Sequence, residues 1–175
     1  DLGYIGGLAV SRDGFTVFVT LVHSGLASAN PVVVSVPAGG GAAVLVADLP
    51  VDSQPGGLAV SPDGISLLVA VRNPVRTLLS LPLLGGTSTN VLSGEGFEFI
   101  TDVDVPRWGQ KLYLGADGTD EILIVPAAGT PTAVPTNVEF IDPVNIALAP
   151  DSSTLFVMDP NIRIDASGRV VGAGG

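Results

Sequence analysis

One fourteen-residue pattern recurs four times along this chain of 175 residues. The copies read GGLAVSRDGFTVFV at 6–19, GGLAVSPDGISLLV at 56–69, TDVDVPRWGQKLYL at 101–114 and VNIALAPDSSTLFV at 144–157. They align without a gap, and their starts are separated by 50, 45 and 43 residues. Self-similarity at such a period is typical of repeat architectures, in which each copy is one structural unit. The chain is therefore predicted to fold as four similar units.

Each unit is predicted to contain short antiparallel strands. A short apolar run such as Leu8–Val10 leads into a turn such as Ser61–Gly64, and a wholly apolar run such as Leu67–Val69 follows. Pro fits the second position of a β-turn, and Asp and Gly fit the later ones. Short apolar runs bounded by turns are typical of strands that are covered on both faces. A third strand is expected at 32–40, 78–86 and 122–129, and a weaker fourth at 43–47, 89–92 and 132–134.

Four strands per unit of about 45 residues is the pattern of a β-propeller blade. We therefore predict an all-β fold, a β-propeller built from four-stranded antiparallel blades. Helices are not favoured, because Gly and Pro make up 37 of 175 residues and no segment keeps helical periodicity. A single domain or arc over 1–175 is expected, with blades at about 4–48, 55–93, 99–135 and 142–172. The last blade is short, and its outer strands are expected at 162–164 and 169–171.

The motif GLAVSPDG, followed by an apolar strand, resembles the blade motif of NHL, YVTN, TolB-type and gluconolactonase-like (SMP/regucalcin-type) propellers. The third-strand ending Val-Pro-Ala-Gly-Gly resembles a TolB-type blade, and the last unit, at 156–168, is more similar to an NHL blade. The resemblance covers nearly the whole chain. It implies the fold and not one activity, because these families place unrelated functions on similar blades.

The number of blades leaves three arrangements open. The resemblance implies six or more blades in a closed propeller, whereas this chain contains four. The chain is a piece of a longer propeller, or it closes as a four-bladed ring, or two or more copies complete a ring or stack end to end. An open arc would expose blade edges and favour self-association through them.

Charge and composition exclude several classes of function. The formal net charge is -10, from 17 acidic and 7 basic residues, which argues against nucleic-acid and anionic-membrane partners. The longest uncharged stretch, Ser24–Ala47, is broken by Pro31, Pro37 and three consecutive glycines, so no membrane insertion is expected. There is no Cys and little Lys, and the chain begins at Asp1. These features favour a processed or excised chain that is secreted or belongs to the cell envelope.

A metal site is one candidate function of the inner strands. Gly7, Gly57, Asp102 and Asn145 are equivalent in the repeat and are expected at the mouth of a central funnel. Resemblance to gluconolactonase-like propellers implies a divalent metal held there by carboxylate and Asn oxygens. Asp102, Asp104 and Asn145 are the candidate ligands, for Ca²⁺ or another divalent cation. Alternatively, these side chains cap strand ends, and Asp104 forms an ion pair with Arg107.

Several other residues are candidate contacts for a partner or ligand. His23 begins an inserted loop at 23–30, and Trp108 replaces the turn Asp of the other units. Asp117, Asp120 and Glu121 form an acidic loop that is either solvated or able to collect Ca²⁺. None of these residues lies in a recognisable catalytic triad or zinc motif.

These observations favour a non-enzymatic extracellular binding or scaffold module that recognises a protein or small-molecule ligand. A self-associating structural repeat protein, forming rings or filaments, is the first alternative. A divalent-metal-dependent, lactonase-like hydrolase is the second.

Overall fold

The computed structural model describes residues 4–22, 30–72, 76–93, 97, 100–108, 111–116, 119–126, 130–136, 138–167 and 170–171. Every helix or strand among them is a β-strand, which confirms the predicted all-β class. The first sheet contains β1 (Tyr4–Val10), β2 (Thr16–Val22), β3 (Val32–Pro37) and β4 (Val44–Asp48). The second contains β5 (Pro55–Val60), β6 (Ser66–Val71), β7 (Thr77–Pro82) and β8 (Thr89–Ser93). The third contains β9 (Ile100–Asp104), β10 (Lys111–Ala116), β11 (Glu121–Pro126) and β12 (Thr132–Ala133).

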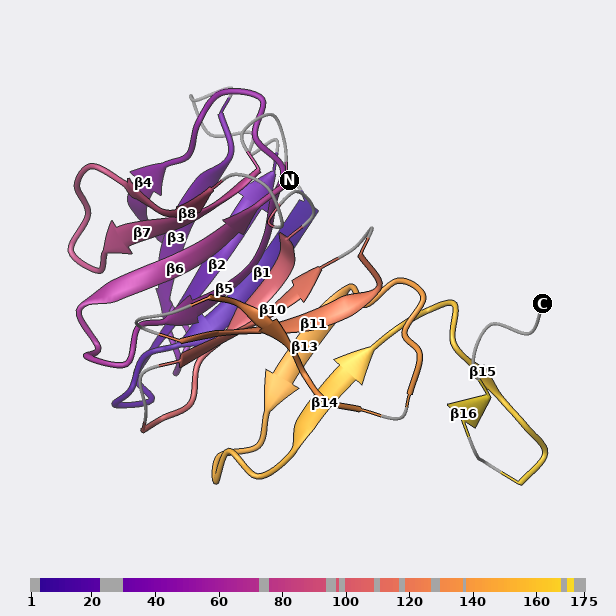
Figure 1. Ribbon diagram of the computed structural model, residues 1–175. Helices are drawn as coiled ribbons and strands as arrows, with labels where there is room; N and C mark the ends of the chain where they lie inside the picture. Colours follow the sequence, from indigo (N-terminus) through magenta and orange to yellow (C-terminus); the bar gives the residue numbers. More distant parts are fainter. Residues whose placement is uncertain are drawn as a thin grey trace.

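Each of these three sheets is an antiparallel meander in chain order, which is the topology of a propeller blade (Figure 1). The fourth unit consists of two separate hairpins, β13 (Asn145–Leu148) with β14 (Leu155–Met158), and β15 (Arg163–Ile164) with β16 (Val170–Val171). The molecule is thus an arc of β-propeller blades, as the repeat predicted. Its first three blades have four strands, and its last blade retains only the inner hairpin.

The outer strands of the last blade lie at the expected positions but do not extend its sheet. β15 and β16 pair with each other and not with β14, and Figure 1 shows their hairpin apart from the rest of the sheets, near the C-terminus. The Asp159 carboxylate accepts N–H groups of Ile141 at 2.7 Å and Asn161 at 3.0 Å. These bonds tie the chain leaving β14 to the segment before β13, so it does not turn back alongside β14.

The strand register reproduces the alignment of the repeats. Leu8 pairs with Val19, Leu58 with Val69, Val103 with Leu114, and Ile146 with Val157. In each blade the next residue of the inner strand, for example Ala9, therefore points to the opposite face. Equivalent residues of the four units consequently occupy equivalent places in three dimensions.

The repeated turn is held by its own side chains. In blade one the Asp13 carboxylate accepts the Ser11 hydroxyl at 2.5 Å and the Phe15 N–H at 3.0 Å. Blade two repeats both bonds with Ser61, Asp63 and Ile65. The position after the Asp has a left-handed backbone, with φ 79° at Gly14 and φ 76° at Gly64. This conformation favours glycine and explains the Asp-Gly pair in the motif.

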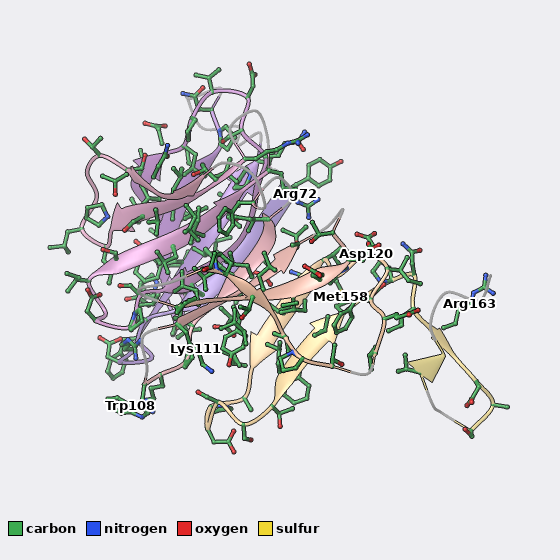
Figure 2. All side chains as sticks on the ribbon, in the orientation of Figure 1. Arg72, Trp108, Lys111, Asp120, Met158 and Arg163 are labelled. Carbon is green, nitrogen blue, oxygen red and sulfur yellow. The ribbon has the colours of Figure 1, made fainter. Side chains whose placement is uncertain are left out.

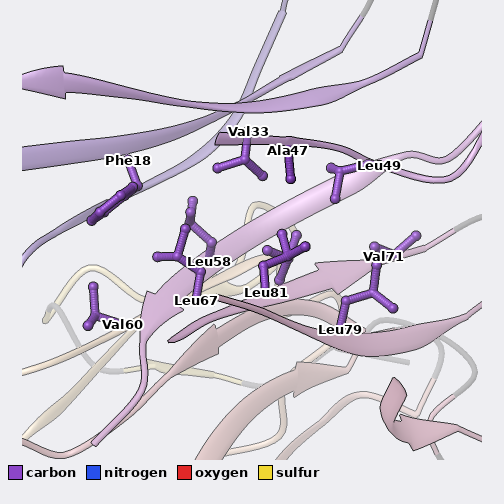
Figure 3. Close-up of a cluster of buried hydrophobic side chains, with 11 residues drawn as sticks. Phe18, Val33, Ala47, Leu49, Leu58, Val60, Leu67, Val71, Leu79 and Leu81 are labelled. Atoms are coloured by element: carbon purple, nitrogen blue, oxygen red, sulfur yellow. The ribbon is translucent and has the colours of Figure 1, made fainter. Parts of the chain in front are cut away.

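The hydrophobic core lies between blades. Phe18, Val33, Ala47 and Leu49 of blade one pack against blade two residues that include Leu58, Val60, Leu67 and Leu81 (Figure 3). The opposite face of blade two, with Ala59 and Leu68, packs against Val103 and Leu114 of blade three. Blade two is therefore covered on both faces by its neighbours.

The inner strands approach one another so closely that side chains are excluded at some positions. A Cβ on Gly56 of β5 would overlap the backbone oxygen of Thr101 in β9. A Cβ on Gly7 of β1 would lie 2.7 Å from Gly57 Cα, a distance that real Cβ contacts do not reach. Two glycines at the start of the inner strand thus allow blade one to dock on blade two, and blade two on blade three.

The close approach predicts a position-specific response to one methyl group. Gly56→Ala forces β5 and β9 apart, and we expect it to lower the free energy of unfolding by about 1–3 kcal/mol. Gly39→Ala is the matched control, because no atom lies within 4 Å of the added Cβ. Its effect is expected to stay within about 0.5 kcal/mol, or to be slightly stabilising. Urea denaturation of both variants measures the difference, and equal stabilities would contradict the close approach.

The turn of blade four predicts a stabilising substitution. Ser152 occupies the place of Gly14 and Gly64 and has a φ of 58°. A non-glycine residue in this region costs about 1–2 kcal/mol, and the extra chain entropy of glycine offsets part of the gain. Ser152→Gly is therefore expected to raise the free energy of unfolding by about 0.5–1 kcal/mol.

Ser153→Gly in the same turn is the control for this substitution. The Ser153 hydroxyl donates to Asp151 at 2.8 Å, and its removal should destabilise the turn. If both variants shift the denaturation midpoint in the same direction, the left-handed strain at Ser152 is not the cause.

Candidate functional site

The four inner strands surround a cavity of about 350 Å³. Its wall is mostly apolar, with contributions from Leu8, Leu58, Val103 and Ile146. The polar side of the wall belongs to β9, where Asp102 and Asp104 lie two residues apart on one face of the strand. This cavity lies where a central funnel was expected, and two of the three candidate metal ligands, Asp102 and Asp104, line it, whereas Asn145 does not.

Asp102 connects blade three to blade four. Its Oδ2 accepts the Ile146 N–H of β13 at 2.9 Å and the Asn145 side-chain N–H at 3.4 Å. Its Oδ1 accepts the Val103 N–H at 2.8 Å. The side chain is only 7% exposed. Asp102 and Asn145 are thus in contact, and Asn145 presents a donor to the carboxylate.

Asp104 makes the same kind of connection one step further along both strands. Its Oδ2 accepts the Leu148 N–H of β13 at 2.7 Å, and its Oδ1 accepts the Val105 N–H at 2.7 Å. Among the described residues Asp104 forms no ion pair with Arg107, and its two oxygens instead accept backbone N–H groups. The two Asp side chains of β9, two residues apart, thus accept the N–H groups of two β13 residues that are also two residues apart.

Burial dominates the ionisation of both carboxyl groups. Loss of solvation raises the pKa of Asp102 above its usual value, although the N–H donors of Ile146 and Val103 act in the opposite direction. The pKa of Asp104 is raised for the same reason and is opposed by the N–H groups of Leu148 and Val105. The inner edge of an innermost strand has no neighbouring strand to accept its N–H groups. The carboxylates of Asp102 and Asp104 accept N–H groups at this edge, and they lose part of their own hydration because they are buried there.

The carboxylate pair offers few ligands to a cation. All four carboxylate oxygens of Asp102 and Asp104 accept backbone N–H groups. The described residues contain no cluster of three or more His, Cys, Asp or Glu side chains that could hold a metal. A divalent ion would have to share oxygens that already accept N–H groups, and the described residues place no third His, Cys, Asp or Glu beside them, so the donor set does not fit a preformed metal site. Metal binding at Asp102, Asp104 and Asn145 remains a prediction.

The predicted contact residues fall in different places. Trp108 is 81% exposed on the blade three turn, with the Arg107 guanidinium 5.6 Å from its ring centroid. Asp120 and Glu121 line a second hollow of about 490 Å³ beside Glu139 and Phe140, away from the funnel. His23 and Asp117 lie outside the described residues.

Sequence reasoning missed the role of Arg12. Its guanidinium Nη2 and Nε donate to the Ser61 oxygen at 3.0 and 3.1 Å, and Nη1 donates to the Arg107 oxygen at 3.2 Å. One side chain therefore joins the turns of the first three blades at one mouth of the funnel. The signal in the sequence was an Arg at a turn position that holds Pro62 in blade two.

The same mouth carries an exposed apolar ring. Phe15 and Ile65 occupy equivalent positions in the turns of blades one and two, and both are exposed, as is Trp108 of blade three. Figure 2 places Trp108 and Lys111 at the same end of the molecule, toward the lower left. We call Phe15, Ile65, Arg107 and Trp108 the turn rim.

Comparison with known proteins supports the fold. No protein-family model and no curated protein matches the sequence. Solved β-propellers superpose on most of it. A chain of a nidogen/laminin complex matches with a TM-score of 0.73 and 15% identity, over 90% of this chain and 57% of that one. A gluconolactonase of Xanthomonas campestris matches with a TM-score of 0.69 and 22% identity, over 90% and 55% of the two chains.

A streptogramin B lyase matches with a TM-score of 0.64 and 19% identity, over 98% of this chain and 54% of that one. The chain therefore spans about half the length of the propellers on which it superposes. It has a β-propeller fold, as the blade motif predicted. Within the described residues, no helix is long and apolar enough to cross a membrane.

The raised pKa values predict a definite dependence of stability on pH. With a folded-state pKa above the ordinary 3.8, the native chain binds a proton at Asp104 more readily than the unfolded chain. The contribution of Asp104 to the free energy of unfolding therefore falls as the pH rises from about 3.8 through the folded-state pKa. Asp104→Asn should remove this trend, so the stability of the parent chain relative to the variant declines toward neutral pH.

Asp63→Asn is the control with the opposite sign. The Ser61 hydroxyl and the Ile65 N–H lower the pKa of Asp63, so its contribution is present at neutral pH and is lost on acidification. Urea denaturation between pH 3 and 7, with a chelator present, compares the two variants with the parent. If the two relative trends have the same sign, the assigned directions are wrong.

Proposed function

We propose that this protein is a non-enzymatic extracellular binding module that holds a protein partner on the turn rim. The observation that carries this proposal is the use of the funnel carboxylates. Asp102 and Asp104 each accept a backbone N–H group of β13 through Oδ2 and the N–H group of the next residue through Oδ1, so the acidic pair of the funnel joins blades three and four. Because the acidic pair is used to join blades, we place partner recognition on the exposed turn rim.

The turn rim has the composition of a binding surface. Aromatic residues and Arg are enriched among the residues that dominate protein–protein binding energy. Trp108 and Phe15 expose large rings, and Arg107 lies over the Trp108 ring. Arg12 fixes the turns of three blades relative to one another, so these side chains are displayed from a rigid base. Rigid display lowers the entropy cost of binding.

Two further observations support a partner that is a protein. The nidogen/laminin structure, with the same fold, is a complex between proteins. The net charge of -10 opposes binding to nucleic acid or anionic lipid. The extracellular location rests on composition, because the chain has no Cys and one Lys.

A metal-dependent, lactonase-like hydrolase is the second candidate. It is favoured by one observation, the pair of buried carboxyl groups with raised pKa that faces a cavity of about 350 Å³. Perturbed carboxyl groups in a cavity are common in active sites. The fold is shared with a gluconolactonase, although 22% identity supports the fold alone.

Metal titration and turnover distinguish the two candidates. We expect Ca²⁺, Mg²⁺ and Zn²⁺ to leave the thermal midpoint unchanged, because a bound ion would stabilise the native state in proportion to the logarithm of its concentration. We also expect no divalent-dependent hydrolysis of gluconolactone above background. Hydrolysis that is lost in Asp102→Ala but kept in Asp120→Ala would overturn the non-enzymatic proposal.

Site-specific crosslinking tests the turn rim directly. A photoreactive residue at position 108 should capture one discrete partner from the extracellular fraction of the source. The same residue at the exposed Leu84, on the β7–β8 turn, is the control and should not. Once the partner is purified, Trp108→Ala is expected to weaken its binding by about 30-fold or more, the effect of losing a central anchor. Equal affinity of this variant and the parent would exclude the rim.

A further inference from the structure

Three of the seven basic residues of the chain lie at or beside the turn rim, namely Arg12, Arg107 and Lys111. The Arg107 guanidinium lies over the Trp108 ring, and the Lys111 Nζ lies 5.2 Å from the ring centroid of Tyr113. Figure 2 shows Lys111 and Trp108 at the same end of the molecule. Within the part of the chain that the structure describes, none of these three cations forms an ion pair. Their charge is therefore available to a partner.

The rim differs in charge from the rest of the molecule. The β1–β2, β5–β6 and β9–β10 turns, together with Lys111 at the start of β10, carry three basic and two acidic residues, a net charge of +1. The rest of the chain carries -11, because the whole has -10. The two acidic residues, Asp13 and Asp63, are bonded within their own turns. The pKa of Asp63 is lowered most by the Ser61 hydroxyl and least by Arg12.

Two arginine residues line the mouth of the cavity between the inner strands. Arg12 and Arg107 both belong to its wall. Arg12 is held by three hydrogen bonds, two to the Ser61 oxygen and one to the Arg107 oxygen. A guanidinium has five N–H donors, so Arg12 keeps two of them for a ligand. Among the described residues, no group accepts a hydrogen bond from the Arg107 side chain, so its donors also remain for a ligand.

We propose that the turn rim binds an acidic segment of its protein partner, in which a Glu or Asp side chain stands beside an apolar one. The carboxylate enters the mouth of the cavity between Arg12 and Arg107, and the apolar neighbour packs on the Trp108 ring. A planar guanidinium suits a carboxylate because it can form two parallel N–H···O bonds with it. This inference rests on the proposed binding at the turn rim and adds the chemistry of the partner.

The composition of the rim favours an acidic segment with apolar residues over a uniform polyanion. Phe15 and Ile65 are exposed on the neighbouring turns, so the surface around the two arginines is apolar. The turn of blade four carries Asp151 and no cation, which limits the favourable charge to blades one to three. A densely charged polyanion would meet the net charge of -10 of the whole chain. A short acidic segment meets mainly the rim, because charges are screened beyond about 8 Å at physiological salt.

The site lies within the arc and not at either end of it. Arg12, Ser61 and Arg107 belong to the inner turns of three consecutive blades, and their mutual hydrogen bonds fix the arrangement. Further blades beside blade one or blade four would add turns to the rim and leave these contacts in place. The inference is therefore independent of how the propeller is completed.

Trp108 is the single Trp of the chain, so its fluorescence emission reports binding at the rim directly. The probe is a blocked hexapeptide of sequence Gly-Leu-Glu-Glu-Leu-Gly, and its analogue with Gln in place of Glu is the matched control. We expect the Glu peptide to bind about tenfold more tightly at low salt, because hydrogen bonds between two charged groups are the stronger ones. The preference should decrease when the salt concentration is raised from about 50 mM to about 500 mM, because exposed charges are screened.

Substitution of Arg107 tests which residue selects the carboxylate. Arg107→Gln should make the Glu and Gln peptides bind equally. The variant is expected to fold, because Arg12 bonds the backbone oxygen of Arg107 and not its side chain. Arg163→Gln removes the same charge from β15, away from the rim, and should keep the preference for Glu. Circular dichroism and the urea midpoint confirm that both variants are folded.

Three results would overturn the inference. The first is equal binding of the Glu and Gln peptides to the parent chain, and the second is a preference for Glu that survives in Arg107→Gln. The third is an oligogalacturonate that binds as tightly as the Glu peptide, because the site would then select carboxylates of a polysaccharide.

The failure of this inference is distinguishable from the failure of the proposed function. If crosslinking at position 108 captures no partner while the Glu peptide still binds selectively, the proposed function fails and the carboxylate site stands. If a partner is captured and its affinity is unchanged in Arg107→Gln, binding at the rim stands and the acidic segment is excluded.

Discussion

The close approach of the innermost strands is the constraint on which the rest of this structure depends. A propeller brings the first strand of every blade to a common axis, where the circumference is smallest. Between blades one, two and three, the pairs Gly6–Gly7 and Gly56–Gly57 meet this constraint by removing side chains. The larger apolar residues then pack further from the axis, where Phe18, Leu67 and Leu81 form the core between the sheets.

Blade three meets the same constraint by a different solution. It places carboxylates where blades one and two have Gly or Ala, and these side chains bond the exposed N–H groups of β13. The neighbouring strand is thus held by side chain to backbone bonds. Buried acceptors of this kind stabilise only while every oxygen has a donor, and here each oxygen does. The two acidic residues that most resembled a metal site are in this way part of the blade docking.

Much of this structure could be predicted from the repeat. The strands, their register and the turn chemistry follow from local residue patterns, and Ser61, Asp63 and Gly64 make the contacts that their types favour. The partners of Asp104 could not be predicted, because its acceptor role depends on a strand 44 residues away. The same holds for Arg12, which reaches the turns of two other blades. Long-range contacts of single side chains leave no periodic signal in a sequence.

The two hairpins with an equivalent Phe show that the burial of a side chain in a repeat protein depends on whether a neighbouring unit covers it. Phe18 and Phe156 are the same side chain at the same position of the same hairpin, yet one is 5% and the other 61% exposed. The difference is the presence of a following blade. Because each unit contacts only its neighbours, the free energy of unfolding of a repeat array increases with each interface that is added between units.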